Sequence, residues 1–316
     1  MIYKEAAQVI KKFNNIALIA HVRPDGDTVS CCAALALALS QLNKTYTLYC
    51  GDAVSQRYSF ITADKFETAY KYKHDLYIAL DCADLARLGP FKEPFEGGKA
   101  ETLNIDHHPS NANYAKYNYR DSDAPATAVI VYEIIKSLQI KITPEIASTI
   151  LTGISSDTGN FAHRNTDEKT FLLAAELIKK GADINLISNN LFKSNTFERQ
   201  KLLGRALSNM RLYAEGRIAV IYTLLTDLAY CKAEPDTTEG FIDHALSVNG
   251  VEIAICVLQH NENTFKVSFR SKGGADVNKL ASFFGGGGHT LASGCNVSGF
   301  FEDALDKLVR TAESYL

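Results

Sequence analysis

Four short apolar runs in the first third of the chain have the length and composition of buried strands. They lie at 15–21, 46–50, 75–81 and 101–106. Each run is followed by a polar segment or by a glycine, as expected where a strand leaves the interior. The chain therefore opens with a series of strands that continues as far as residue 106.

Longer patterns between and after these runs predict helices. The first covers 27–42 and is almost entirely apolar, which indicates a buried helix. Two more cover 124–138 and 143–159, the last with Thr143 as N-cap and Pro144 at its first helical position. Because strands alternate with helices, we expect an α/β fold with a mostly parallel sheet flanked by helices on both faces.

The pattern changes near residue 209. Hairpin-like strands with Glu-Gly and Asn-Glu-Asn turns occur at 211–224 and 251–271, and helical patterns lie between and after them. We therefore expect an α/β domain over 1–190, a helical connector over 191–208 and a smaller α+β domain over 209–316.

Composition restricts the class of protein. The 316 residues carry a net charge of −3 and include seven cysteines, and no two of these form a CxxC pair. These features favour a cytoplasmic protein with reduced thiols. The longest apolar stretch, 29–39, is too short to span a bilayer, and no signal-peptide pattern occurs at the start. A slightly acidic chain is also a poor match for long duplex nucleic acid, whose phosphates attract a basic excess.

Acidic and histidine side chains gather where the predicted strands end. In an open α/β sheet, ligands bind beyond the carboxyl ends of the strands. Asp and His are also the ligands that suit hard or borderline divalent ions. Three of the four strands end in such residues, and one further aspartate lies late in a helix. The set comprises His21, Asp25, Asp27, Asp81, Asp106, His107, His108 and Asp157.

Each of these residues also has a simpler interpretation when taken alone. Asp81 is equally well explained as a helix N-cap, Asp25 and Asp27 flank a glycine as in a turn, and His21 is compatible with an ordinary strand end. Asp157 is harder to explain, because a carboxylate among apolar helical residues needs a partner. Independent capping roles would not place Asp or His after nearly every strand. The combination favours two metal ions that share a carboxylate, an arrangement suited to chemistry on phosphate esters.

The segments that contain these residues resemble the motifs of a known family. The segments "HVRPDGD", "ALDCAD", "NIDHHPSN" and "GISSDTGNF" are similar, in order and spacing, to the four motifs of the DHH phosphoesterases. The later segment 268–295, with "FRS" and "GGGGH", resembles the DHHA1 domain that accompanies them. Within the family, the chain is most similar to the small bacterial enzymes that degrade nano-RNA and dephosphorylate 3′-phosphoadenosine 5′-phosphate.

The resemblance implies a role for each motif residue. Two divalent ions, most often Mn²⁺, are expected, with Asp81 as the bridging ligand. Asp106 would orient His107 through its ring N–H, and His108 would face the substrate, binding a phosphate oxygen or moving a proton to the leaving oxygen. The implied ligands are His21, Asp25 and Asp81 for one ion, and Asp27, Asp81, His107 and Asp157 for the other.

The second domain is expected to contact the substrate in a cleft between the two domains. Arg270 and Ser271 lie at a strand end, and Arg270 is suited to a bidentate phosphate contact. Residues Gly286, Gly287, Gly288 and His289 form a segment whose backbone N–H groups are open to an anion, with a flexible hinge or a plain turn as the alternative. Thr127, at the start of a helix, is a weaker candidate for phosphate binding, and a simple helix start explains it equally well.

The leading hypothesis is a metal-dependent phosphoesterase for short oligoribonucleotides, for linear dinucleotides such as pApA, and for 3′-phosphoadenosine 5′-phosphate. Within the family, the alternative is an exopolyphosphatase or pyrophosphatase. A non-catalytic nucleotide-binding protein is a second alternative, but no expected ligand position is substituted. No membrane partner is expected, and the oligomeric state stays open, with a homodimer as one alternative.

Overall fold

The computed structural model describes residues 2–62, 65–97 and 100–316. The chain divides into two compact units, Met1–Ser194 and Asn195–Leu316. Among the helices of the described ranges, none combines the length and the apolarity needed to cross a membrane. The two units are described separately.

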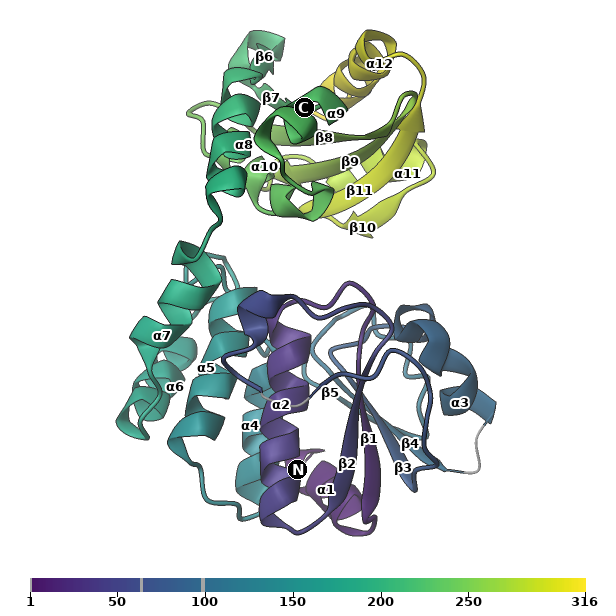
Figure 1. The fold of residues 1–316 in the computed structure, drawn as a ribbon, viewed down its shortest axis with the longest axis vertical. Helices are drawn as coiled ribbons and strands as arrows, with labels where there is room; N and C mark the ends of the chain where they lie inside the picture. The colour runs from purple at the N-terminus through teal and green to yellow at the C-terminus, as the bar shows by residue number, and fades with distance from the viewer. Residues whose placement is uncertain (1, 63–64, 98–99) are drawn as a thin grey trace. The chain divides into compact units, whose positions relative to one another are not determined.

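The first unit is built on a five-stranded parallel sheet in the order β2-β1-β3-β4-β5 (Figure 1). The four predicted strands are present and run in parallel, so their carboxyl ends lie at the same edge. The fifth strand was not predicted, because its half-buried sequence, "YNYR", has no apolar run. The strands are β1 (Asn15–Ala20), β2 (Thr45–Cys50), β3 (Leu76–Leu80), β4 (Glu101–Asp106) and β5 (Tyr117–Arg120).

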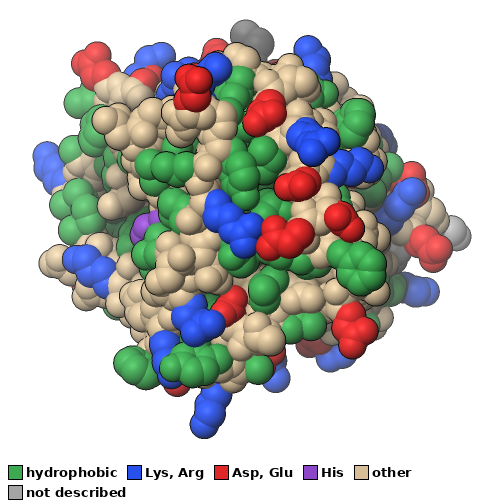
Figure 2. Space-filling view, turned by 90° about the horizontal axis from the view of Figure 1, so that it is seen from above, with side chains coloured by type: hydrophobic (Ala, Val, Ile, Leu, Met, Phe, Trp, Pro, Cys, Tyr) green, Lys and Arg blue, Asp and Glu red, His purple; other side chains and the backbone are tan. Residues whose placement is uncertain are grey.

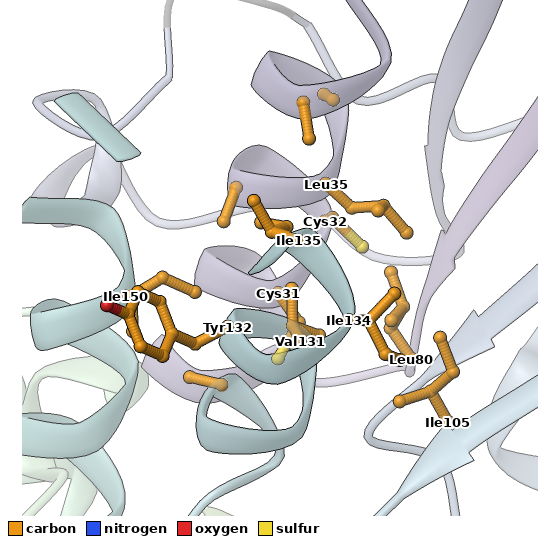
Figure 3. Close-up of a cluster of buried hydrophobic side chains, with 14 of the residues drawn as sticks. Cys31, Cys32, Leu35, Leu80, Ile105, Val131, Tyr132, Ile134, Ile135 and Ile150 are labelled. Carbon is orange, nitrogen blue, oxygen red and sulfur yellow. The ribbon is translucent and has the colours of Figure 1, made fainter. Parts of the chain in front are cut away.

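Helices α1, α2, α4 and α5 share the main core of this unit with one face of the sheet (Figure 1). Figure 3 shows part of that core, where Cys31, Leu35, Leu80, Ile134 and Ile150 lie together. Helix α5 begins as predicted, with Thr143 as N-cap and Pro144 in the first turn. The helices of the unit are α1 (Ile2–Lys11), α2 (Gly26–Gln41), α3 (Lys92–Gly97), α4 (Thr127–Ser137), α5 (Pro144–Asp157), α6 (Glu168–Lys179) and α7 (Ile184–Ser188).

The opposite face of the sheet carries a smaller, aromatic-rich cluster. Tyr49 and Tyr77 of the sheet pack there with Phe91 and Phe95, which come from the irregular segment Leu85–Phe91 and from α3. Both faces of the parallel sheet are therefore covered, one by long helices and the other by short ones. This coverage explains why the strand sequences are apolar almost throughout.

The second unit is an α+β structure on a six-stranded mixed sheet, ordered β10-β11-β9-β8-β7-β6. Only β7 and β8 are parallel neighbours, and the other pairs are antiparallel. The strands are β6 (Arg211–Tyr213), β7 (Ile218–Thr223), β8 (Ile253–Asn261), β9 (Thr264–Ser271), β10 (Gly287–His289) and β11 (Ala292–Ser298).

The helices of this unit lie on both faces of its sheet. Helices α11 (Val277–Phe283) and α12 (Phe301–Glu313) pack on one face, and α8 (Phe197–Ser208), α9 (Leu225–Cys231) and α10 (Phe241–Leu246) pack on the other. Helix α8 buries Leu202 and Ala206 in the second of these cores. The segment 191–208, expected as a connector, spans the boundary between the units, because 191–194 belongs to the first unit and 195–208, with α8, belongs to the second.

Candidate metal centre

The six expected ligands come together at the carboxyl edge of the first sheet. His21 follows β1, Asp81 follows β3, and His107 follows β4, while Asp157 closes α5. Their nitrogen and oxygen atoms form groups of three within 4.8 Å of one another. The two groups that together hold all six are His21, Asp25 and Asp81, and Asp27, His107 and Asp157.

The first group is built around the His21 ring. Its Nε2 lies 3.5 Å from an oxygen of Asp25 and 3.7 Å from an oxygen of Asp81, and it has no hydrogen-bond partner among the described residues. Asp25 also caps α2 by accepting from the N–H groups of Asp27 and Thr28. Asp81 has a φ of 60°, so the chain turns sharply where β3 ends. Such backbone strain in a non-glycine residue is typical of functional sites.

In the second group, His107 Nε2 lies 3.5 Å from Asp157 and 3.7 Å from Asp81, so its ring stands between two carboxylates. The third member, Asp27, is fully buried. Asp27 accepts N–H bonds from Thr127 and Ala128 at the start of α4. A helix N-terminus offers unpaired N–H groups and a partial positive charge, so it stabilises this buried carboxylate.

A close helix contact makes room for Asp27. At Gly153 of α5, a Cβ atom would lie 2.6 Å from the Cβ of Ala128 and 2.8 Å from a carboxylate oxygen of Asp27. Only glycine therefore allows α5 to approach α4 this closely beside the carboxylate. The "GISSD" motif thus serves the site twice, through this glycine and through Asp157.

Asp106 orients a different histidine from the one expected. Its Oδ1 lies 2.8 Å from Nδ1 of His108 and accepts the backbone N–H of His107. The ring Nδ1 of His107 instead lies 3.1 Å from the carbonyl oxygen of Ala124. The expectation that Asp106 orients the His107 ring is therefore wrong. A main-chain carbonyl holds that ring, and such an acceptor leaves no trace in the residue types.

Asn111 is a supporting residue that the sequence interpretation missed. Its amide donates to Asp106 and to Asn104, which is buried in β4. Both asparagines are part of the segment "NIDHHPSN", so the motif itself was the available signal. Arg87 was also missed, and its Nη2 lies 2.9 Å from Nδ1 of His21.

The structure gives Thr127 a different role from phosphate binding. Its hydroxyl donates to Asp81 at 2.8 Å, and its backbone N–H donates to Asp27 at 2.6 Å. Thr127 is fully buried, so neither group is open to a substrate phosphate. The expected contact with phosphate is replaced by a contact with two of the clustered carboxylates.

The carboxylates are crowded enough to perturb one another. Burial, followed by the charge of Asp81, raises the pKa of Asp27 well above its usual range. Burial also raises the pKa of Asp157 to about 7. Burial lowers the pKa of His21, but Asp25 and Asp81 outweigh it and raise that pKa to about 9. These raised pKa values show that the negative charges of the cluster are not balanced by nearby cationic groups.

This arrangement fits divalent cations. The carboxylate and imidazole groups are those that divalent ions bind, and the cluster has too much carboxylate and too little thiol for a structural zinc site. The Nε2 atom of His21 is buried without a hydrogen-bond partner in the described structure and faces two of the carboxylates. Divalent ions would satisfy that nitrogen and offset the repulsion between the carboxylates.

Two expected substrate residues of the second unit lie at the end of β9. Arg270 is half-buried, and its Nη1 donates to the carbonyl of Phe269. Ser271 is buried, and its hydroxyl accepts the N–H groups of Gly273 and Ala275. The Ser271 hydroxyl therefore closes the turn after β9.

The glycine segment is an edge strand. Gly287, Gly288 and His289 form β10 and pair with β11. At Gly286 a Cβ atom would lie within 3.0 Å of Gly294 and Cys295, and at Gly288 it would lie 2.6 Å from the carbonyl oxygen of Ala292. The close approach of β10 to β11 thus requires glycine at these two positions.

Comparison with known proteins gives the same two-part organisation. Residues 15–154 match the model of the DHH family, N-terminal domain, and residues 219–316 match that of the DHHA1 domain. A Thermus thermophilus protein named bifunctional oligoribonuclease and PAP phosphatase NrnA is 30% identical over 98% of this chain and 93% of its own length. A Bacillus subtilis protein of the same name is 27% identical over 98% and 97%.

Two solved structures share the fold. An exopolyphosphatase-related protein from Bacteroides fragilis superposes with a TM-score of 0.93 at 24% identity, covering 99% of this chain and 96% of its own. RecJ from Thermus thermophilus, solved with Mn²⁺, gives a TM-score of 0.63 at 15% identity, covering 99% and 54%.

Proposed function

Because the chain belongs to the DHH family and carries a DHHA1 domain, we propose that it is a metal-dependent hydrolase of short phosphate esters. Its substrates are short oligoribonucleotides, linear dinucleotides such as pApA, and 3′-phosphoadenosine 5′-phosphate. The observation that carries the proposal is the convergence of His21, Asp25, Asp27, Asp81, His107 and Asp157 on one edge of the sheet. The names of the Thermus and Bacillus relatives support the substrate class.

The cofactor in this proposal is a pair of divalent ions, and the metal is Mn²⁺. His21 and Asp25 would hold one ion, and Asp27, His107 and Asp157 would hold the other, with Asp81 as the shared ligand. Two such ions supply Lewis-acid activation of the phosphate and of the attacking water. Support for Asp81 as the shared ligand comes from its position, 3.7 Å from both His21 and His107.

His108 and Asp106 supply the proton chemistry. Burial lowers the pKa of His108, but its bond to Asp106 outweighs burial and raises the pKa above its usual value. That rise favours the protonated ring, which would donate a proton to the leaving ribose oxygen. Asp106 acts as a positioning residue, because it fixes the His108 ring and is itself held by Asn111.

The first unit, residues 1–194, is the catalytic part in this proposal, and the second, residues 195–316, binds substrate. Arg270 contacts a phosphate. His289 and the backbone N–H groups of Gly286, Gly287 and Gly288 form the rest of this contact, since β10 is the edge strand of its sheet. Ser271 keeps the end of β9 in place.

Short substrates agree with the charge of the chain. Its net charge is −3, and acidic and basic side chains are interspersed on the face shown in Figure 2. A long polyanion would be held better by an extended basic surface. We therefore propose a cytoplasmic enzyme for short fragments, active without a membrane partner, and we leave open whether it works as a homodimer.

The test is hydrolysis with Mn²⁺ of pApA, a five-nucleotide RNA, 3′-phosphoadenosine 5′-phosphate and pyrophosphate. We expect turnover of the first three, loss of turnover with a chelator, and two ions per chain by elemental analysis. Asp81→Asn should abolish turnover. Its matched control is Asp75→Asn, because Asp75 is exposed just before the same strand and its carboxylate accepts the N–H of Asn15.

Each other outcome has a definite meaning. Preferred turnover of pyrophosphate would refute the proposal in favour of a pyrophosphatase. Nucleotide binding without turnover would favour a non-catalytic protein. One ion per chain would contradict the shared role of Asp81.

A further inference from the structure

On one face of the second sheet, the helices cover β7 and β8, and α10 also reaches β9. Val267 and Phe269 of β9 point into the core with α11 and α12, so the residues between them face the other side. On that other side, Ala254 and Leu258 of β8 are buried in the core with α8, α9 and α10. The same side of β9, β11 and β10 contributes no buried residue to that core. We call this part the open half-face.

The strand register defines the residues of the open half-face. Directly paired residues in antiparallel strands share a face. Arg270 pairs with Ala292, which pairs with His289, and Ser268 pairs with Gly294, which pairs with Gly287. A third row joins Lys266 to Asn296. The open half-face thus carries Lys266, Ser268, Arg270, Gly287, His289, Ala292, Gly294 and Asn296.

The charge of this surface suits a polyanion. Its side chains are cationic or neutral, and the strand positions that form it include no carboxylate. Lys266 and Asn296 are exposed, and Lys266 has no ionic partner within the described ranges. Because Gly294 has no side chain and Ala292 has only a methyl group, a base or ribose can lie close to the backbone at these positions.

Arg270 and Lys266 are far enough apart to bind separate phosphates. They lie four residues apart on one strand, which corresponds to about 13 Å at the usual rise per residue. A phosphate held by Arg270 therefore leaves Lys266 for another phosphate further along an extended strand.

We propose that Lys266 and Asn296 form an additional phosphate subsite, which binds a nucleotide beyond the one held by Arg270. This inference rests on the proposed function and deepens it, because the subsite makes the enzyme favour oligoribonucleotides over mononucleotides. A substrate with a single nucleotide fills only the Arg270 end. A five-nucleotide RNA reaches both cations.

The experiment compares Lys266→Ala with the wild type on 3′-phosphoadenosine 5′-phosphate and on a five-nucleotide RNA. We expect kcat/KM to fall about fivefold for the RNA, the size of one partly solvated phosphate contact, and to stay unchanged for the mononucleotide. Lys266→Arg should retain RNA activity. Lys279→Ala is the matched control, since Lys279 is an exposed lysine on α11, which packs on the opposite face of the sheet.

A second readout is RNA affinity against salt concentration. The slope of log affinity against log salt should become shallower by about 0.7 in Lys266→Ala, as expected for the loss of one phosphate contact to a single strand. Equal losses on both substrates, or unchanged RNA turnover with an unchanged slope, would overturn the subsite. A wild-type protein inactive on every nucleotide would instead refute the proposed function, so the two failures are distinguishable.

Discussion

Replacement of Thr127 by valine tests whether the start of α4 donates hydrogen bonds to the clustered carboxylates or binds a substrate phosphate. Valine keeps the shape of the side chain but removes the hydroxyl that donates to Asp81 at 2.8 Å in the buried site. A hydrogen bond to a charged group contributes about 1.5–3 kcal/mol, so the metal-free protein should lose stability of that order. Because the hydroxyl orients a carboxylate that we propose as a metal ligand, the Kd for Mn²⁺ should also rise about 10–100-fold.

The assay combines urea unfolding of the metal-free protein with calorimetric titration of Mn²⁺. Thr152→Val is the matched control, because Thr152 is equally buried but donates to Ser148 within its own helix. That control should cost about 1 kcal/mol in stability and leave the Kd for Mn²⁺ unchanged. If Thr127→Val kept wild-type metal affinity and raised only KM, Thr127 would be a phosphate contact and our assignment would be refuted.

Two further predictions concern pH and the glycine strand. Burial raises the pKa of Asp157 to about 7 from an unfolded value near 3.8, so its contribution to the stability of the metal-free protein is fully present below pH 3.8 and is lost as pH rises through 7. Melting temperatures between pH 5 and 8 should therefore fall more steeply in the wild type than in Asp157→Asn, and parallel curves would contradict the shift. Gly288→Ala should cost about 1–3 kcal/mol in urea unfolding, because its Cβ would lie 2.6 Å from the carbonyl oxygen of Ala292 at a φ of 151°. Gly287→Ala is the control and should change stability by less than about 0.5 kcal/mol, since its Cβ would meet only Asn278, at 3.8 Å.

The sequence predicted the elements that carry strong local signals. The four apolar runs of the first unit are strands, and the Thr143-Pro144 start of α5 has its predicted capping geometry. The candidate ligands could be collected from the sequence because parallel strands bring their carboxyl ends to one edge. That rule needs only the order of strands and the residue that follows each, and both are visible in the sequence.

The partners of those ligands could not be predicted in the same way. The His107 ring contacts the carbonyl of Ala124, and Asp27 accepts backbone N–H groups at the start of α4. Main-chain groups are present at every residue, so residue type does not show which of them will be used. β5 was missed for a related reason, since a half-buried edge strand has no apolar run to reveal it.

The start of α4 stabilises the clustered carboxylates of the first unit and is therefore not available to bind a substrate phosphate. Thr127 and Ala128 direct their N–H groups at Asp27, and the Thr127 hydroxyl is directed at Asp81. A helix N-terminus that would otherwise attract a substrate phosphate is thus occupied by carboxylates of the protein itself. In our proposals, the substrate phosphates are therefore bound by the metal ions and by two cationic side chains of the second unit, Arg270 and Lys266. Thr127→Val should therefore alter metal affinity, whereas Lys266→Ala should alter the preference for substrate length and leave metal affinity unchanged.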